Sequence, residues 1–197
     1  FSSPNSSDKR IELINWTPNN DQFEKILPSG ETVAQYEIRK EALELRKKTF
    51  RSRIKLAFRE RFLEADSVYQ NDPDSETFDD SEYEKAKVDF VRNWAEKELK
   101  QPLDDQQAAA VAGTARNIHV KARAGSGKTK TLVTRAIFLI KHCNISPNKL
   151  LLLAFNKNAA EEMKSRIGEF VGEETPHVMT FHALGYAIVS PRKKILH

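Results

Sequence analysis

Apolar residues recur at helical spacing over a long stretch in the first half of the chain. Between about Thr32 and Ala65 they follow one another at intervals of seven, four or three residues, which places them on one stripe of a long helix. The stripe consists of Leu43, Phe50, Ile54, Phe58, Phe62 and Ala65. Residues 1–30 carry Ser-Ser-Pro-Asn-Ser-Ser and Thr-Pro-Asn-Asn, which form turns and loops, so this part is predicted to be extended or weakly ordered.

A second helix is predicted after an acidic interruption. Residues 66–80 are rich in carboxylates and contain a proline, a composition that predicts a loop. Ser81 and Glu84 then have the spacing of a capping box, and the helix they open ends before Pro102. Its apolar face consists of Tyr83, Phe90 and Trp94. Two helices joined by a loop indicate a helical hairpin over residues 31–101, interpreted as an accessory region or structural arm.

The pattern changes after Pro102 to an alternation of helices and short apolar runs. The predicted elements are a helix from Asp104 or Asp105 to Ala112 that Gly113 ends, a strand at 118–122, a helix at 128–142, a strand at 150–155, a helix that the capping box Asn158-x-x-Glu161 opens and that runs to Phe170, a strand at 176–179 and a helix at 181–189. The run at 150–155 is apolar throughout, as expected for a parallel strand buried on both faces. This alternation predicts part of an α/β domain with a parallel sheet over residues 102–197.

Charge is segregated along the chain, although the net charge of its 197 residues is only +4. Residues 64–89 hold ten carboxylates against two lysines, whereas residues 121–197 hold thirteen Lys or Arg against five Glu. The basic C-terminal half is suited to a polyanion. Residues 37–61 are also basic, with ten Lys or Arg and four Glu, but a solvated helix face is the favoured interpretation there.

Several classes of protein are excluded by composition. The longest apolar run has six residues, far below the about 20 that cross a membrane, and no signal peptide is visible. The single cysteine, Cys143, cannot form an internal disulfide, which fits a reducing compartment, so a cytoplasmic protein is expected. His119, His142 and His177 are scattered without metal-ligand spacing. The chain begins at Phe1 and is interpreted as a fragment or a processed form.

The strongest chemical signal is the segment Ala-Arg-Ala-Gly-Ser-Gly-Lys-Thr at residues 122–129. Small residues let the backbone curl so that successive N–H groups point at phosphate oxygens, and a following helix directs its positive dipole end at the same anion. Lys128 can reach the β- and γ-phosphates, and the Thr129 hydroxyl can ligate Mg²⁺. A strand before the loop and a helix after it are predicted, which is the context that a phosphate-binding loop requires.

Four blocks of sequence together resemble the UvrD/Rep-like superfamily 1 DNA helicases, and within them the helicase IV type. Leu103–Gln107 is similar to the Q motif, Ala124–Thr129 to motif I, Leu152–Met163 to motif Ia and Thr180–Leu184 to motif Ib. The blocks occur in the family's order and span Leu103 to about Val189. The resemblance implies a RecA-like P-loop domain, of which this chain carries the N-terminal part, and an ATP-dependent helicase of 3′–5′ polarity.

The resemblance also implies roles for individual residues toward ATP and Mg²⁺. Gln107 takes the place of the glutamine that hydrogen-bonds adenine, and Lys130 stands where relatives commonly have an arginine that contacts the base. The residues implied in cofactor binding are Gln107, Ala124, Gly125, Ser126, Gly127, Lys128, Thr129 and Lys130, with Lys128 and Thr129 as the catalytic pair and Thr129 as the Mg²⁺ ligand.

Motifs Ia and Ib imply contacts to single-stranded DNA from Phe155, Asn156, Lys157, Thr180, Phe181 and His182. An exposed aromatic ring beside a cationic side chain suits base stacking next to a phosphate, while hydroxyl and imidazole groups suit the sugar–phosphate backbone. Two alternatives remain open at this stage. Phe155 has the alternative of a buried core residue, and His182 that of a histidine that caps the start of a helix.

The acidic pair that ATP hydrolysis needs is not found after Phe155, where the chain has five glutamates and no aspartate. The fragment alone is therefore expected to be inactive, and the remainder of the motor, including a second RecA-like domain, is expected as its partner. Three hypotheses follow: a helicase motor acting on single-stranded or tailed DNA, a helicase–nuclease subunit for DNA repair or defence, and a non-catalytic module that binds nucleotide or DNA.

Overall fold

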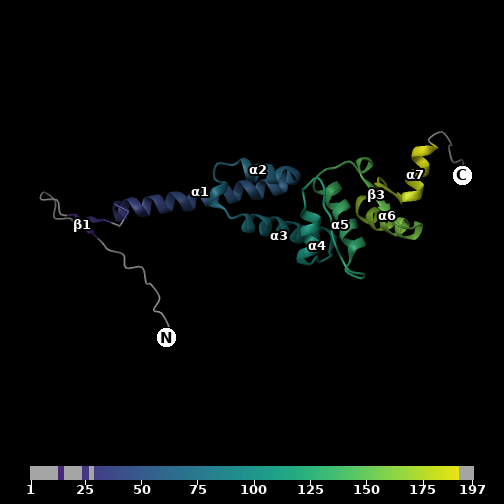
Figure 1. Ribbon diagram of the computed structural model, residues 1–197, viewed down its shortest axis with the longest axis horizontal. Helices are drawn as coiled ribbons and strands as arrows, with labels where there is room; N and C mark the ends of the chain where they lie inside the picture. Colours follow the sequence, from purple (N-terminus) through teal and green to yellow (C-terminus); the bar gives the residue numbers. More distant parts are fainter. Residues whose placement is uncertain (1–12, 16–23, 27–28, 191–197) are drawn as a thin grey trace, which may run out of the picture. The chain divides into compact units, whose positions relative to one another are not determined.

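The computed structural model describes residues 13–15, 24–26 and 29–190, and the chain divides into two compact units, Phe1–Ser52 and Arg53–His197 (Figure 1). The predicted extended segment at residues 1–30 lies almost entirely outside the described residues. The first unit contains the antiparallel strands β1 (Leu13–Asn15) and β2 (Glu24–Ile26) and the beginning of α1 (Val33–Glu60).

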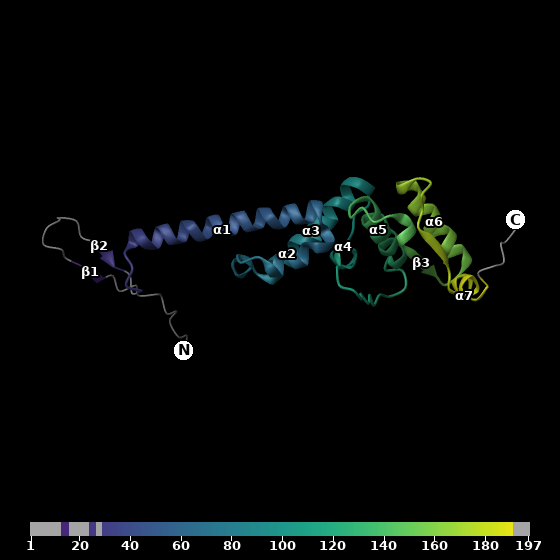
Figure 2. The same cartoon turned by 90° about the horizontal axis from the view of Figure 1, so that it is seen from above.

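Helix α1 begins at a reciprocal cap. Thr32 Oγ1 accepts a hydrogen bond from the Gln35 amide at 3.2 Å, and Gln35 Oε1 accepts one from the Thr32 amide at 3.0 Å. These bonds satisfy two donors that the first turn of a helix leaves unpaired, which explains why the helix starts here. The predicted long helix is thus confirmed over 28 residues, and Figure 2 shows it as one uninterrupted rod.

The predicted apolar stripe is buried from its second member onward: Phe50, Ile54, Phe58, Phe62 and Ala65 are buried, whereas Leu43 is exposed. The helix does not continue to Ala65, however. It ends at Glu60, a 3₁₀ turn follows at Phe62–Glu64, and α2 (Ala65–Asn71) begins a new direction. The break lets Phe62 turn into the core between Phe58, Phe90 and Phe138, with ring centroids 4.8–5.8 Å apart.

The prediction of a loop over residues 66–80 is wrong for most of that segment, because α2 and a 3₁₀ turn at Ser75–Thr77 occupy it. The acidic residues are ordered by basic partners. Arg53 donates to Asp72 Oδ1 at 2.8 Å and to Asp74 Oδ2 at 2.7 Å, which brackets the proline between them. Local composition did not reveal these partners, since Arg53 lies about twenty residues earlier in the chain.

Helix α3 (Asp80–Leu99) begins one residue before Ser81, where the predicted capping box starts. Its N-cap is Asp79, whose carboxylate accepts a hydrogen bond from the Ser81 amide at 2.6 Å, so the prediction of Ser81 as the cap is wrong. A carboxylate at this position also interacts favourably with the positive end of the helix dipole. The hydrogen bonds from Ser81 hold the pKa of Asp79 below its ordinary value.

A buried lysine joins α2 and α3 to the loop after the next helix. Lys87 is 3% exposed, and its Nζ donates to Asp66 Oδ1 at 2.5 Å and to Thr114 Oγ1 at 2.9 Å. Tyr83 Oη donates to the same carboxylate at 2.6 Å. Burial by itself would raise the pKa of Asp66, but the hydrogen bonds from Lys87, Thr114 and Tyr83 outweigh it and lower that pKa.

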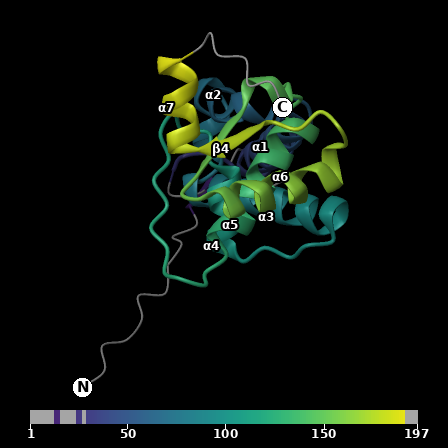
Figure 3. The ribbon, with the colours of Figure 1, turned by 90° about the vertical axis from the view of Figure 1, so that its right-hand side faces the viewer.

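The C-terminal half of the second unit follows the predicted alternation closely. It contains α4 (Asp105–Ala112), α5 (Lys128–Lys141), a 3₁₀ turn at Pro147–Lys149, β3 (Leu151–Ala154), α6 (Lys157–Val171), β4 (His177–Thr180) and α7 (Phe181–Val189). Strands β3 and β4 pair in parallel, with Leu151 opposite His177 and Ala154 opposite Thr180. Helices α5 and α6 and strand β3 share one hydrophobic core that includes Ile137, Leu152, Met163 and Ile167, and Figure 3 shows β4 running into α7.

Three details of this half differ from the predictions. Residues 118–122 form no strand; they lie in a coil between α4 and α5, with Ile118 and Val120 exposed (Figure 2). Strand β3 is not buried on both faces, because Leu151 is 48% exposed. The N-cap of α6 is Asn156, which accepts from the Ala159 amide at 2.8 Å, and not Asn158. The first difference has a physical reason: a strand needs hydrogen-bond partners for its amides and carbonyls, and no described strand flanks residues 118–122.

The described residues therefore form a mostly helical structure with a small parallel sheet of two strands, which is consistent with part of a helicase domain. It is not a complete RecA-like fold. Among these residues, no helix is both long enough and apolar enough to cross a membrane.

Replacing Lys87 by Met should lower the free energy of unfolding by about 3 kcal/mol, because the Asp66 carboxylate would lose its buried counter-charge. The matched control is Lys85→Met, an exposed position on the same helix, where a change within about 0.5 kcal/mol is expected. Chemical denaturation of the chain measures both. Equal losses in the two variants would contradict the role given to the buried ion pair.

Candidate nucleotide site and nucleic-acid edge

The loop before α5 has the backbone geometry of an anion cradle. Gly125 and Gly127 take φ angles of +78° and +79°, a region that residues with a Cβ adopt only under strain. In the described part of the chain, the amides of Gly125, Gly127, Lys128 and Thr129 have no acceptor, whereas the Ser126 amide bonds the Arg123 carbonyl at 3.3 Å. Free amides at the start of a fourteen-residue helix form a site of positive potential.

Lys128 is folded back onto this loop. Its Nζ donates to the Arg123 carbonyl at 2.6 Å and to the Ala122 carbonyl at 3.3 Å. These acceptors are exposed main-chain oxygens, and no carboxylate competes for the ammonium group among the described residues. The charge is therefore held beside the free amides and can transfer to a phosphate oxygen without breaking an ion pair.

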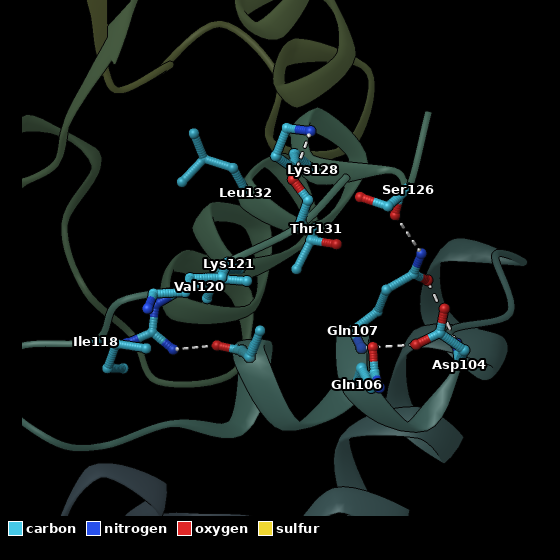
Figure 4. Close-up of a pocket in the computed structure, with 13 residues that line it drawn as sticks. Asp104, Gln106, Gln107, Ile118, Val120, Lys121, Ser126, Lys128, Thr131 and Leu132 are labelled. Atoms are coloured by element: carbon cyan, nitrogen blue, oxygen red, sulfur yellow. Dashed lines mark hydrogen bonds between the residues drawn. The ribbon is translucent and has the colours of Figure 1, made fainter. Parts of the chain in front are cut away.

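Gln107 connects α4 to the phosphate loop. Asp104 Oδ1 accepts from the Gln107 amide at 2.8 Å, and Gln107 Oε1 accepts from the Asp104 amide at 3.3 Å, so the two residues form a capping box. The Gln107 Nε2 donates to the Ser126 carbonyl at 3.2 Å, and Figure 4 shows this side chain reaching toward Ser126. A Cβ added at Gly127 would lie 2.9 Å from the same Nε2, so the glycine permits this approach.

A cavity of about 420 Å³ opens beside the loop (Figure 4). Its lining combines α4, the coil before the loop and α5: Asp104, Gln106, Gln107, Ala110, Ile118, Val120, Lys121, Ala122, Ser126, Lys128, Thr131, Leu132 and Arg135. Three predicted cofactor residues, Gln107, Ser126 and Lys128, thus come together on one cavity. The volume falls in the range typical of small-ligand sites.

The remaining predicted cofactor residues lie outside this lining. Ala124 and Gly125 are exposed in the turn, and Thr129 follows Lys128 in the first turn of α5. Lys130 points elsewhere: its Nζ donates to the Pro102 carbonyl at 2.7 Å, and it lines a separate cavity of about 190 Å³ with Arg166 and Phe170. In this structure Lys130 therefore ties α5 to the segment before α4.

The predicted DNA residues gather where β3 and β4 end. Because Ala154 is paired with Thr180, the next residues, Phe155 and Phe181, both follow the carboxyl edge of the parallel sheet. Phe155 is 92% exposed and Phe181 is 63% exposed, so the alternative of Phe155 as a core residue is excluded. Two exposed rings at one sheet edge are unusual enough to indicate an interaction site.

The polar residues of motifs Ia and Ib either cap a helix or lie exposed at the surface. Asn156 caps α6, and Thr180 caps α7 by accepting from the Ala183 amide at 3.2 Å. Since Thr180 provides that cap, the alternative of His182 as the capping residue is excluded, and His182 is exposed. Lys157 is exposed and lies 3.7 Å from Glu161, a weak pair that leaves its ammonium accessible.

The donor set for a metal is limited. The described residues include no group of three His, Cys, Asp or Glu side chains that could hold a metal ion. Thr129, the predicted Mg²⁺ ligand, lies in the first turn of α5 directly after Lys128. Burial raises the pKa of the Cys143 thiol to about 11 despite the opposing charge of Arg135, which disfavours the thiolate form at neutral pH.

Arg135 is a cavity residue that the sequence motifs did not predict. It donates from Nη1 to the carbonyls of Ala110, Val111 and Gly113. A signal for it exists in the sequence, since Arg135 lies seven residues after Lys128 and therefore on the same face of α5. Its acceptors could not be anticipated, because they are main-chain atoms of another helix.

Residues 103–195 match the family described as UvrD/REP helicase N-terminal domain. The resemblance to the UvrD/Rep-like helicases that the four motifs predicted is thereby confirmed for this segment of the chain. Over 93 residues, 47% of the chain, it is 45% identical to DNA helicase IV of Escherichia coli. It is 39% identical over 83 residues, 41% of the chain, to a probable DNA helicase II homolog of Mycoplasma capricolum, and 36% identical over 88 residues, 44% of the chain, to the ATP-dependent DNA helicase PcrA of Staphylococcus epidermidis.

The matched segment covers a small part of these relatives. It spans 14% of DNA helicase IV and 12% of the other two proteins. The names of these relatives describe whole proteins, which are much longer than the segment that each shares with this chain.

Alanine at Gly125 and at Gly127 should each destabilise the chain by about 1–2 kcal/mol through the positive φ. The cost at Gly127 should be larger by about 1 kcal/mol, because the new Cβ displaces the Gln107 amide from the Ser126 carbonyl. In a Gln107→Ala background, thermal or chemical denaturation should give the two glycine substitutions the same cost. A difference that persists there would show that Gln107 is not the group in contact.

Proposed function

We propose that this chain is part of an ATP-driven DNA helicase and contributes the phosphate cradle for ATP and part of the track for single-stranded DNA. The observation that carries the proposal is the set of free amides from Gly125 to Thr129 beside the loosely held ammonium of Lys128. The family match of residues 103–195 supports the DNA substrate. The 3′–5′ polarity is proposed from the resemblance of the four motifs alone.

In the proposed complex the triphosphate lies on the amides of Gly125, Gly127, Lys128 and Thr129. The Lys128 ammonium leaves the carbonyls of Ala122 and Arg123 and binds the β- and γ-phosphates, which offer it stronger, charged acceptors. Thr129 would hold Mg²⁺ through its hydroxyl, and the ion would supply positive charge that neutralises the phosphates. Ser126 and Ala124 shape the turn, and Lys130 anchors α5 near Pro102. Gln107 lines the cavity, and its amide would exchange its bonds to the Asp104 amide and the Ser126 carbonyl for bonds to the base.

Single-stranded DNA is proposed to cross the carboxyl edge of β3 and β4. Phe155 and Phe181 offer two exposed rings on which bases stack without regard to sequence. Lys157 lies next to Phe155 and can pair with a phosphate, while Asn156, Thr180 and His182 supply polar contacts to the backbone. Binding should therefore be independent of sequence and should weaken as the salt concentration rises.

Hydrolysis is proposed to need the remainder of the motor. The chain after Phe155 has no aspartate, and its glutamates fall on α6 or in the loop that follows it, so no acidic residue ends a described strand. An acidic pair and arginines from a second RecA-like domain would complete the site. No observation on the described residues favours the helicase–nuclease hypothesis or the non-catalytic module, and neither is proposed.

Lys128→Ala should lower the affinity of the chain for ATP by about tenfold to a hundredfold, since a charge-assisted contact to phosphate is lost. Lys141→Ala is the matched control, because Lys141 is an exposed lysine at the other end of α5. Titration calorimetry measures both, and equal affinities in the two variants would overturn the cradle. An ATPase activity of the chain alone, abolished by Lys128→Ala, would contradict the need for the remainder of the motor.

Phe155→Ala should weaken binding of a single-stranded oligonucleotide by about 1–3 kcal/mol through loss of one stacking surface. Leu151→Ala is the control, since Leu151 is an exposed apolar residue at the opposite end of the same strand. Fluorescence anisotropy at several salt concentrations gives the affinity and its salt slope. If Leu151→Ala had the larger effect, or if the affinity did not change with salt, the proposed track would be wrong.

A further inference from the structure

Arg135 joins two helices that line the cavity. It lies on α5, two turns after Lys128, and its Nη1 donates to three carbonyls at the end of α4: Ala110 at 3.1 Å, Val111 at 2.8 Å and Gly113 at 2.9 Å. The last carbonyls of any helix lack partners within the helix. A cation at this end also interacts favourably with the helix dipole. Arg135 therefore caps α4 from a different helix.

The environment of Arg135 is costly for a charge. Burial lowers the pKa of its guanidinium and outweighs the opposing effect of Cys143. Among the described residues no carboxylate pairs with Arg135, so main-chain carbonyls are its only compensating acceptors. An aliphatic side chain could fill the same space without this cost. The hydrogen bonds to these carbonyls therefore explain why a guanidinium and not an aliphatic side chain occupies this position.

Helix α4 depends on such contacts because it is short. It has eight residues, fewer than an isolated helix needs to be stable in water. At its amino end, Gln107 bonds the Ser126 carbonyl of the phosphate loop, and at its carboxyl end Arg135 bonds three carbonyls. Both ties lead to α5 or to the loop before it. On the side of α5, the place of Gln107 relative to Lys128 is thus set at two points, of which Arg135 is the half-buried one.

We infer that Arg135 is a positioning residue for recognition of the nucleotide base: it holds α4 against α5 so that the Gln107 amide stays beside the phosphate cradle. This inference rests on the proposed binding of ATP at the loop. It separates two parts of one site, since the cradle amides and Lys128 belong to α5 and its loop, whereas Gln107 belongs to the helix that Arg135 holds. Loss of Arg135 should therefore affect the base and spare the phosphates.

The test compares ATP with inorganic tripolyphosphate on the same 197-residue chain. Arg135→Met should weaken ATP binding by roughly tenfold and leave tripolyphosphate binding unchanged within about twofold. Gln107→Ala should show the same selective loss, and the double variant should lose no more than either single variant, because both act on one contact. Arg135→Lys keeps the charge and a donor, so it should recover part of the ATP affinity. Arg166→Met, an exposed arginine on α6, should change neither affinity.

Each other outcome has a distinct meaning. If Arg135→Met weakens both ligands equally, Arg135 supports the fold in general and the inference is wrong. If it weakens neither, the three carbonyl bonds do not position Gln107. If Arg135→Met does not fold, as judged by circular dichroism, Arg135→Lys decides the matter: a loss restricted to ATP supports the inference, and an equal loss overturns it. If the unmodified chain binds neither ligand, the proposed function fails, and the inference fails with it.

Discussion

The burial of α5 is the constraint on which the rest of the second unit depends. Val133, Thr134, Ala136, Ile137 and Phe138 are buried along its length, while its first turn is open. Phe138 contacts Phe62 and Trp94 edge to face, with ring centroids at 4.8 Å, and His142 at the helix end bonds the Phe58 carbonyl at 2.7 Å. Burying a side chain such as Phe138 contributes about 1.5–3 kcal/mol. A helix held this firmly can keep free amides at its first turn, because tertiary packing and not local pairing determines where it begins.

The same packing connects the preceding helices to α4 and α5. The aromatic residues of α3 contact α5, and Asp66, Lys87 and Thr114 connect α2 and α3 to the end of α4. Arg92 on α3 also pairs with Asp105 at the start of α4. Residues 53–100 and the Q-motif helix therefore share one compact unit. A shift of α3 would be transmitted to Gln107 through these contacts, so the helices before Pro102 bear directly on the base side of the cavity.

Short-range patterns predicted the elements that local chemistry controls. The cap of α4 by Asp104, one of the two aspartates expected there, its end at Gly113, and the positions of the helices and strands from Leu151 to Val189 were predicted, because caps, periodicity and turn residues act within a few positions. The N-cap of α6 and the burial of β3 were not. Predictions failed where a distant partner decides the outcome. Arg53 orders the acidic segment that looked like a loop, and the apolar run at 118–122 stays in a coil since no described strand pairs with it.

The residues of the candidate site likewise fall into two groups: those that the sequence predicted and those whose positions only the tertiary structure decided. Residue types and spacing by themselves predicted the proposed phosphate loop, its lysine and the aromatic residues after two strands, because a cradle of glycine amides and a stacking ring would require those residues at those positions. Only the tertiary structure decided that Phe155 and Phe181 lie exposed on one sheet edge, that Lys130 turns to the Pro102 carbonyl, and that Arg135 caps a neighbouring helix. Each of these depends on strand register or on main-chain carbonyls far away in the chain, and neither leaves a mark in the local sequence.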